Sequence, residues 1–223
     1  MTNTIKQIQK CVGVTVDGDF GNKTLAAVAQ RLGCAESVRV VQHVVGSDVD
    51  GVVGKETASK IAVALGLFVW PSQAEVRSGK SIFGKPGRET NLVNIEPPYQ
   101  LYYEGRPVKS IRVHKLIAKA VLTALEKIKA AYSSAEISRL GLDDYGGCYN
   151  YRLSKGGNSF SMHAWGIALD FAPSKNALKT KAPHASLSKP ECRAFWEAWE
   201  SVGAVSLGRE RNYDWMHVQF ATL

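Results

Sequence analysis

Two short segments contain residues with the types and spacing of a catalytic metal site. They are Ser161-Met-His163-Ala-Trp-Gly166-Ile-Ala-Leu-Asp170 and Asp214-Trp-Met-His217-Val-Gln219. His163, Asp170 and His217 are candidate ligands, and two imidazoles with one carboxylate leave a fourth zinc position open for water. Asp214 is a spare carboxylate, which a hydrolase needs in order to take a proton from that water. The pattern therefore favours a catalytic site over a structural one.

Strands and bends are predicted around these residues. Alternation of apolar residues over 167–171 predicts a strand with one buried face and Asp170 on the other face. Gly166 permits a bend before that strand, which would bring His163 to the same site. Residues 215–220 alternate in the same way, and a spacing of three does not place Asp214 and His217 on one strand face. We therefore expect Asp214 in the bend that enters the second strand.

The same segments resemble the zinc D-alanyl-D-alanine carboxypeptidases and L-alanyl-D-glutamate endopeptidases, a family that includes many bacteriophage endolysins. The family signature is Ser-x-His-x-x-Gly-x-Ala-x-Asp followed by Asp/Glu-x-x-His, and both parts are present here. The resemblance implies zinc on His163, Asp170 and His217, with Asp214 as the general base. Arg152 matches an upstream family arginine, which implies that it stabilises the substrate carbonyl as an oxyanion. The likeness covers roughly the last 140 residues.

Other features of this segment bear on the resemblance. The run from Phe83 to Gly87, with Asn91-Leu-Val and Pro97-Pro-Tyr, is similar to the upstream part of the endolysin branch. No His-Glu-x-x-His motif occurs, which excludes the better-known metalloprotease pattern. We interpret His43, His114 and His184 as core or surface residues, with His114 capping or exposed at a helix start. Ser161 is interpreted as either a turn residue or a support for the site, and Trp165 as a buried aromatic.

The N-terminal part contains an internal repeat with an offset of 33 residues. Ile5, Ile8, Gln9, Asp17-Gly18, Gly21 and Thr24 recur as Val38, Val41, Gln42, Asp50-Gly51, Gly54 and Thr57. Each copy predicts a short helix, an Asp-Gly turn and a second helix that ends at Gly33 or Gly66. Thr24 and Thr57 are expected near the start of the second helices, where a hydroxyl can cap free amides. Two copies predict one compact helical bundle.

This repeat resembles the peptidoglycan-binding domain found beside many cell-wall hydrolases. The resemblance implies that residues 1–67 bind the wall, while the Asp-Gly and Gly positions are explained by turn geometry. Residues 68–80 are rich in Pro, Ser and Gly without a clear period and are the predicted linker. Residues 81–223 are the predicted zinc peptidase domain. The fold class expected is α+β: a small all-helical domain, then a domain with a small antiparallel sheet.

Two helices are predicted in the second domain. Apolar residues between Val113 and Tyr132 follow helical spacing, which predicts one long amphipathic helix. A second helix is expected from Pro190 to Val202, with Phe195, Trp196 and Trp199 on its apolar side.

The net charge is unevenly divided between the two predicted domains. Residues 1–67 hold seven Lys/Arg and six Asp/Glu, whereas the whole chain has a net charge of +8, so most of the positive charge lies on residues 68–223.

A basic second domain raises the question of its partner. Nucleic acid is one candidate for a basic protein, but no recognition helix, zinc finger or aromatic-basic repeat occurs in the sequence. An anionic polymer such as a bacterial wall fits equally well, and the repeat favours peptidoglycan. No Cys-x-x-Cys spacing links the four cysteines, which are expected to be unpaired thiols, although a Cys11–Cys34 disulfide is an alternative.

The sequence also carries an expectation about location. It starts without a basic-then-apolar signal peptide and has no run of about 18 apolar residues. We expect a monomer made in a host cytoplasm, with no membrane insertion. The resemblance implies that it reaches the wall through a holin-type membrane lesion.

Three classes of function stay open at this stage. The first is a zinc peptidase that cuts peptidoglycan, either as an L-alanyl-D-glutamate endopeptidase or as a D-alanyl-D-alanine carboxypeptidase. The second is a non-haem iron oxygenase, which also uses two histidines and one acid, but usually with a closer His-x-Asp pair. The third is a metal-stabilised wall-binding module without activity, which would have no use for Asp214. The separate wall-binding repeat favours lysis, and therefore the endopeptidase.

Overall fold

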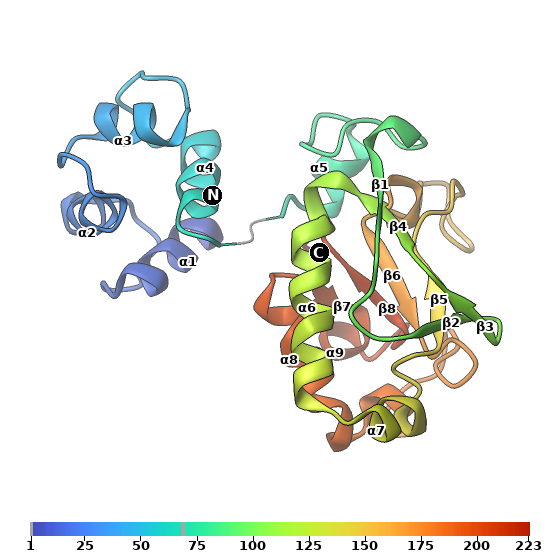
Figure 1. The fold of residues 1–223 in the computed structure, drawn as a ribbon. Coiled ribbons are helices and arrows are strands. Elements are labelled where there is room, and N and C mark those ends of the chain that lie inside the picture. Colours follow the sequence, from blue (N-terminus) through green and yellow to red (C-terminus); the bar gives the residue numbers. More distant parts are fainter. Residues whose placement is uncertain (1, 68–69) are drawn as a thin grey trace. The chain divides into compact units, whose positions relative to one another are not determined.

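The computed structural model describes residues 2–67 and 70–223, and it divides the chain into two compact units, Met1–Val69 and Trp70–Leu223 (Figure 1). Helices and small antiparallel sheets make up its regular structure, as the predicted α+β class requires. Among the described residues, no helix has both the length and the apolar character needed to span a bilayer.

The first unit is helical and contains both copies of the repeat. Its helices are α1 (Thr2–Val12), α2 (Asn22–Leu32), α3 (Val38–Val45) and α4 (Lys55–Ala64). They enclose a core formed by Ile5, Ile8, Val28, Ala29, Val41, Ala58, Ile61 and Ala62. Because Ile8 and Val41 are equivalent positions of the two copies, the duplicated sequence builds one shared core.

The repeated polar residues form two equivalent hydrogen-bond networks. In the first copy, Gln9 Nε2 donates to Asp17 Oδ1 at 2.6 Å and to Thr24 Oγ1 at 3.2 Å, while Gly18 N donates to Gln9 Oε1 at 2.9 Å. In the second copy, Gln42 makes the same bonds at 2.7, 3.3 and 2.8 Å. The expectation that the threonines cap helices is wrong, because their hydroxyls accept from the buried glutamine amides instead. Gly21 and Gly54 occupy the N-cap positions.

Most of the predicted linker belongs to the second unit. Residues 68–69 lie outside the described residues, but residues 70–80 belong to the second unit and include helix α5 (Gln73–Arg77). Trp70 Nε1 donates to Val202 O at 2.9 Å, and its ring packs edge-on against Phe220 with centroids 5.1 Å apart. A Ser72–Glu75 capping box starts α5. The polar composition of this segment reflects a helix cap and not a free linker.

The second unit is built around an antiparallel sheet of four strands in the order β5-β6-β8-β7. These strands are β5 (Tyr145–Gly147), β6 (Ala168–Phe171), β7 (Val205–Ser206) and β8 (His217–Gln219). Two further antiparallel pairs lie outside this sheet. One joins β1 (Leu92–Ile95) to β4 (Ile111–His114), and the other joins β2 (Leu101–Tyr103) to β3 (Arg106–Val108). Residues 168, 169 and 171 are fully buried, so β6 is covered on both faces and not on one.

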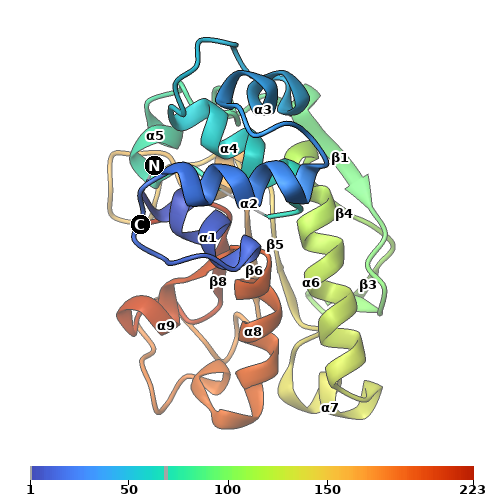
Figure 2. The same ribbon diagram turned by 90° about the vertical axis from the view of Figure 1, so that its left-hand side faces the viewer.

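The further α-helices of the second unit are α6 (Ala118–Ala131), α7 (Ser134–Leu140), α8 (Arg193–Ser201) and α9 (Leu207–Arg211). Of these, α6 and α8 lie side by side (Figure 2). The short 3-10 helices are η1 (Glu89–Asn91), η2 (Lys115–Ile117), η3 (Met162–Trp165), η4 (Ser186–Ser188) and η5 (Pro190–Cys192). Helix α6 packs against α8, and the Phe171 ring of β6 lies 5.4 Å from Phe195 and 5.6 Å from Trp199, centroid to centroid.

Two sequence predictions concern these helices. The helix expected over Pro190 to Val202 is present as η5 followed by α8, with Phe195, Trp196 and Trp199 buried. The helix expected from Val113 begins instead at Ala118, because Val113 and His114 pair with β1 in strand β4. His114 is buried, and its Nδ1 accepts from Leu116 N at 3.2 Å. Capping of a helix start is therefore correct for His114, whereas exposure is wrong.

Candidate metal centre

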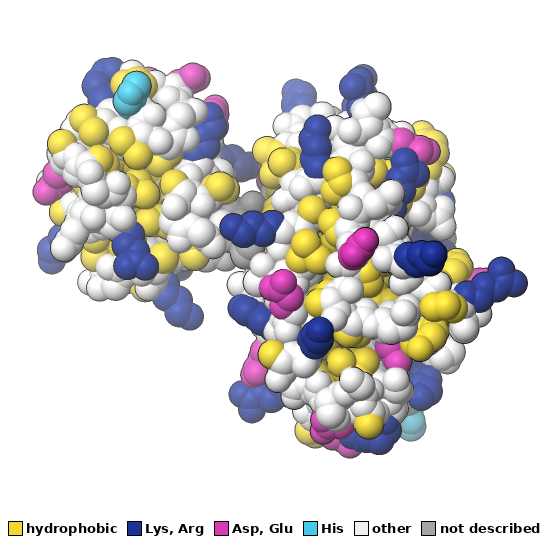
Figure 3. Space-filling model, viewed as in Figure 1, with side chains coloured by type: hydrophobic (Ala, Val, Ile, Leu, Met, Phe, Trp, Pro, Cys, Tyr) yellow, Lys and Arg dark blue, Asp and Glu magenta, His cyan; other side chains and the backbone are white. Residues whose placement is uncertain are grey.

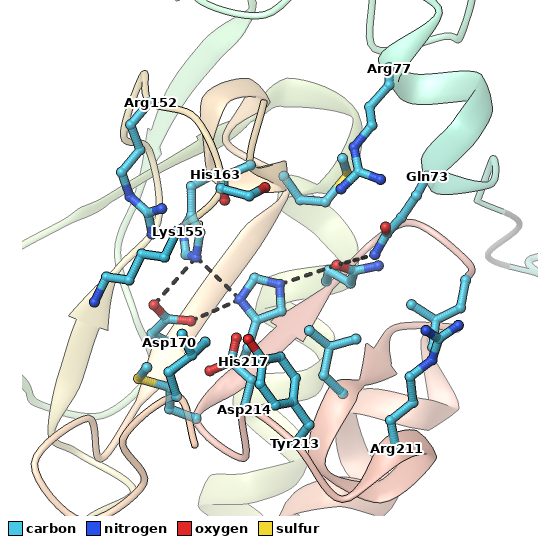
Figure 4. Close-up of a pocket in the computed structure, with 18 residues that line it drawn as sticks. Gln73, Arg77, Arg152, Lys155, His163, Asp170, Arg211, Tyr213, Asp214 and His217 are labelled. Atoms are coloured by element: carbon cyan, nitrogen blue, oxygen red, sulfur yellow. Dashed lines mark hydrogen bonds and ion pairs between the residues drawn. The ribbon is translucent and has the colours of Figure 1, made fainter. Parts of the chain in front are cut away.

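Strand pairing brings the predicted ligands together. Asp170 on β6 lies directly opposite His217 on β8 in the antiparallel register. His163 belongs to η3, which ends at Gly166 with φ of +68°, a backbone conformation that glycine adopts without strain. A Cβ atom at Gly166 would also lie 2.7 Å from Leu92 Cδ2. The predicted bend therefore exists, and one ligand atom from each of His163, Asp170 and His217 lies within 4.8 Å of the others (Figure 4).

The distances among the ligand atoms fit a zinc ion. His163 Nε2 lies 3.2 Å from His217 Nδ1 and 3.3 Å from Asp170 Oδ2, and His217 Nδ1 lies 3.0 Å from Asp170 Oδ1. Nitrogen and oxygen ligands about 2.0–2.1 Å from a tetrahedral zinc are about 3.3 Å apart. The three side chains therefore have the separation that a single tetrahedral ion requires.

The outer nitrogens of both histidines are held by hydrogen-bond acceptors. His163 Nδ1 lies 2.6 Å from the carbonyl oxygen of Cys148, so it donates and carries a proton. His217 Nε2 lies 3.2 Å from Gln219 Oε1, whose amide is oriented because Gln219 Nε2 donates to Ala221 O at 2.6 Å. In the neutral rings the inner nitrogens then present lone pairs toward each other and toward Asp170. A cation between them removes this repulsion, and such outer partners are typical of metal-binding histidines.

Electrostatics within the cluster follow from burial and from these contacts. Burial raises the pKa of Asp170, but hydrogen bonds and charge from His163 and His217 outweigh it and hold the pKa below its usual value. For His217, burial lowers the pKa, while the Asp170 carboxylate outweighs that effect and raises it. Both shifts reflect the attraction between Asp170 and the imidazoles, which keeps the carboxylate ionised, the form that binds a cation. A cation bound there takes the place of the proton on His217.

Asp214 lies beside the cluster without being part of it (Figure 4). It precedes β8 in a tight turn in which His217 N donates to Asp214 O at 3.0 Å, as expected from the spacing of three. Its φ is +54°, which lies in the left-handed region of backbone conformation. Few residues other than glycine adopt this region, and asparagine and aspartate are enriched among those that do. Burial raises its pKa, and among the described residues its buried Oδ1 has no hydrogen-bond partner. Asp214 is thus a buried carboxylate with an unused acceptor atom.

The cluster and Asp214 line one pocket of about 330 Å³, which is within the range of ligand sites. Arg152 and Ser161 line the same pocket, and Arg152 Nη1 donates to Leu153 O at 3.1 Å. Trp165 does not line it, because its ring is buried and its Nε1 donates to Gly84 O at 2.8 Å. His43 and His184 are exposed, as interpreted from the sequence. All four cysteines are unpaired thiols.

Several residues of the site were missed by reasoning from sequence. Gln219 orients His217, and Gln73 Nε2 of α5 donates to Gln219 Oε1 at 3.1 Å. Gly146 lets β5 approach β6, the strand that carries Asp170, because a Cβ atom at position 146 would lie 2.8 Å from Asp170 Cβ. Gln219 shares a strand face with His217 two positions earlier, which is a usable signal. Gln73 and Gly146 come from distant segments, and nothing in their local sequence marks them.

Comparisons with protein-family models, with curated proteins and with solved structures found no match to this chain. The chemistry of the site is therefore argued from its own geometry. Three candidate ligands on one side of a pocket can hold a divalent cation. The free Oδ1 of Asp214 next to them, which has no hydrogen-bond partner in the described residues, can accept a proton from a molecule bound at the open position.

Proposed function

We propose that the second unit is a zinc peptidase that hydrolyses peptide bonds of bacterial peptidoglycan. The observation that carries this proposal is the convergence of two imidazole nitrogens and one carboxylate beside Asp214, whose buried Oδ1 has no hydrogen-bond partner among the described residues. The sequence resemblance to endolysin peptidases supplies the substrate. Zinc, when bound there, lowers the pKa of a water molecule and polarises the substrate carbonyl.

The protein's own residues then move the proton and stabilise charge. Asp214 accepts a proton from the attacking water as the new carbon–oxygen bond forms. It returns the proton to the amide nitrogen as the carbon–nitrogen bond breaks. Burial raises the pKa of Asp214, which makes it a stronger base than a solvated aspartate. Arg152, which lines the pocket, donates hydrogen bonds to the carbonyl oxygen as negative charge develops.

The first unit is proposed to bind peptidoglycan without performing chemistry. Its repeated Gln, Asp, Gly and Thr residues bond to one another, so these side chains support the turns. Wall contacts are therefore assigned to the domain and not to the motif residues. The full chain should sediment with purified sacculi, and a chain lacking residues 1–67 should sediment poorly while it still cleaves soluble peptides. Equal lysis of intact walls by both proteins would contradict this role.

Asp214→Asn tests the role of the base. The substitution keeps shape and polarity but removes proton acceptance, so zinc should stay bound while turnover falls by about a hundredfold or more. Asp144→Asn is the matched control, because burial also raises the pKa of Asp144 but it lies outside the pocket lining. Metal analysis of both proteins distinguishes zinc from iron. Near-normal turnover of zinc-loaded Asp214→Asn would show that another group is the base.

The bond that is cut is proposed from the resemblance. An L-alanyl-D-glutamate endopeptidase severs the peptide bridges of the wall, as a lytic protein must, whereas removal of a terminal D-alanine leaves existing cross-links in place. Mass spectrometry of products from purified peptidoglycan separates the two activities. New N-terminal D-glutamate supports the endopeptidase. Free D-alanine as the sole product identifies a D-alanyl-D-alanine carboxypeptidase instead.

A further inference from the structure

Four cationic side chains line the pocket and come from three separate segments. Arg77 is the last residue of α5, Arg211 is the last residue of α9, and Arg152 and Lys155 lie in the loop between β5 and η3. Figure 4 shows Arg152 and Lys155 on one side of the histidine–aspartate cluster and Arg77 and Arg211 on the other side. The positive charge is therefore divided into two pairs that flank the candidate metal centre.

These cations lack the acidic partners that arginines have elsewhere in the unit. Arg112, Arg193 and Arg209 each pair with a glutamate, at 2.8, 2.7 and 3.0 Å. Across the described parts of the chain, none of the four pocket cations forms a salt bridge, although the charge of Lys155 acts on the Asp214 carboxyl group. Arg77 and Arg152 donate only to backbone carbonyls, those of Phe160 and Leu153. The carboxylates that line the pocket are Asp170, committed to the histidines, and Asp214.

A pocket with this balance of charge attracts anions. Four cations around a candidate site for a divalent ion repel one another, and an incoming anion relieves that repulsion. Arginine presents a planar fork of donors that matches a carboxylate with two parallel hydrogen bonds. Arg152 has a proposed role at the carbonyl oxygen, but that role does not explain Arg77 and Arg211 on the opposite side.

We propose that Arg77 and Arg211 recognise a substrate carboxylate on the side of the metal centre opposite Arg152 and Lys155. The preferred substrate is then a peptide with a free carboxylate on the side of the bond that faces Arg77 and Arg211. This inference rests on the proposed peptidase function, since it assigns specificity to the same pocket. It makes Arg77 and Arg211 specificity-determining residues and gives them no part in proton transfer.

The test compares four synthetic peptides of one sequence that contains an L-alanyl-D-glutamyl bond. The carboxylates are free on both sides of that bond, converted to amides on either side, or converted on both sides. Dissociation constants are measured with the zinc-loaded full chain carrying Asp214→Asn, so that the peptides survive. Amidation on the side that faces Arg77 and Arg211 should weaken binding by about tenfold, the size expected when a charge-assisted hydrogen bond is lost.

The decisive comparison adds Arg77→Gln with Arg211→Gln. In that protein the same amidation should cost little, while Arg77→Lys with Arg211→Lys should restore part of the preference. Arg106→Gln is the matched control, because it removes one charge from an exposed strand residue outside the pocket lining and should keep the tenfold preference. A full preference in the double glutamine protein, or its loss in the Arg106→Gln control, would overturn the inference. Failure of all four peptides to bind would also overturn it.

Cleavage by the zinc-loaded protein without Asp214→Asn is measured in parallel. If none of the four peptides is cut although zinc is bound, the proposed peptidase function fails. The charge preference in binding still decides the role of Arg77 and Arg211, so the two failures are distinguishable.

Discussion

Gln219 is the residue that orients the outer nitrogen of His217. Its Oε1 accepts from His217 Nε2 and from Gln73 Nε2, while its own amide donates to Ala221 O. Gln219→Leu keeps the size but removes the acceptor, so zinc affinity should fall by about tenfold to a hundredfold. Competition with a chromophoric chelator measures this directly. Gln219→Glu keeps an acceptor and should lose less, whereas unchanged affinity of the leucine variant would show that Gln219 does not hold the ring.

At the residue scale, sequence reasoning found the groups whose identity the chemistry dictates. His163, Asp170, His217 and Asp214 stood out because few residue types bind a metal or accept a proton, and two short motifs contain all four. The cations on the second side of the pocket could not be found in this way. Lysine and arginine are common on every surface; on the face shown in Figure 3 they are interspersed with acidic residues. Only the fold brings Arg77 and Arg211 to the lining of one pocket.

Strand β5 approaches β6, the strand that carries Asp170, closely at Gly146. This residue lies at a register shift between β5 and β6, where its neighbours Tyr145 and Gly147 pair with Phe171 and Asp170. An added Cβ would lie 2.8 Å from Asp170 Cβ, a separation that forces one strand to move. Gly146→Ala should therefore displace Asp170 and weaken zinc binding by about tenfold or more.

The control for this strand contact is Gly157→Ala in the same unit. There an added Cβ would meet nothing closer than Ser154 Cβ at 3.8 Å, and the backbone conformation is open to alanine. Zinc affinity of both variants is measured by the same chelator competition. Equal affinities for the two alanine variants would mean that the sheet absorbs the added methyl without moving Asp170.

The two Asp-Gly turns of the first unit should make its stability depend on pH. Hydrogen bonds lower the pKa of Asp17, chiefly from the Asp19 backbone, and that of Asp50, chiefly from the Gln42 side chain. The ordinary pKa value of an aspartate is 3.8. A carboxylate whose pKa is lowered by folding stabilises the folded state at pH values above this ordinary pKa. That stabilisation is lost as pH falls from 3.8 through the lowered pKa.

Hydrogen exchange of the Gly18 and Gly51 amides in the full chain reports on each turn, because both amides donate to the glutamines. Protection should decline below pH 3.8, the ordinary pKa value of both carboxyl groups. In a protein with Asp17→Asn and Asp50→Asn, protection should be lower at neutral pH and nearly flat in acid. The same acid decline in that protein would assign the pH dependence to other groups.

At the element scale, the sequence predicted elements better than their boundaries. The sequence predicts a helix between Val113 and Tyr132, but Val113 and His114 belong to strand β4 and the helix begins at Ala118. Ile111 and Val113 are buried in the strand, and their apolar character continues smoothly into the helical pattern that follows. The end of β4 is decided by pairing with β1, about twenty residues earlier in the chain. Local periodicity carries no information about such a partner.

For the whole molecule, the structure predicts where the second unit can be separated. A protein that starts at residue 70 keeps the Trp70–Val202 and Gln73–Gln219 hydrogen bonds, whereas one that starts at residue 81 loses both, together with α5. The shorter protein should have a Tm at least about 5 °C lower, since the contact of the half-buried Trp70 ring with the buried Phe220 is removed. Thermal unfolding of the two zinc-loaded proteins measures the difference. Equal Tm values would show that residues 70–80 do not stabilise the second unit and act as a linker.

The two-unit division itself was accessible from the sequence, because a repeat that ends near residue 66 marks one folded body. The start of the second unit at Trp70 could not be predicted from the sequence, for a physical reason. Pro71, Ser72 and Ser78 look like linker residues, yet Ser72 accepts from Glu75 N as a helix cap and Gln73 N donates to Thr222 O at 2.8 Å. The partners that order this segment lie about 150 residues away, beyond the reach of any local pattern.

That contact between residues 72–73 and 222 also closes the second unit on itself. Ser72 and Thr222 form an isolated parallel bridge, and Thr222 N donates to Pro71 O at 3.0 Å. A unit whose first and last segments are neighbours can be inserted as a cassette into a surface loop of another protein, or cut open elsewhere after its ends are joined. Recombination can therefore exchange this unit between carriers without rebuilding the sheet that forms its candidate site.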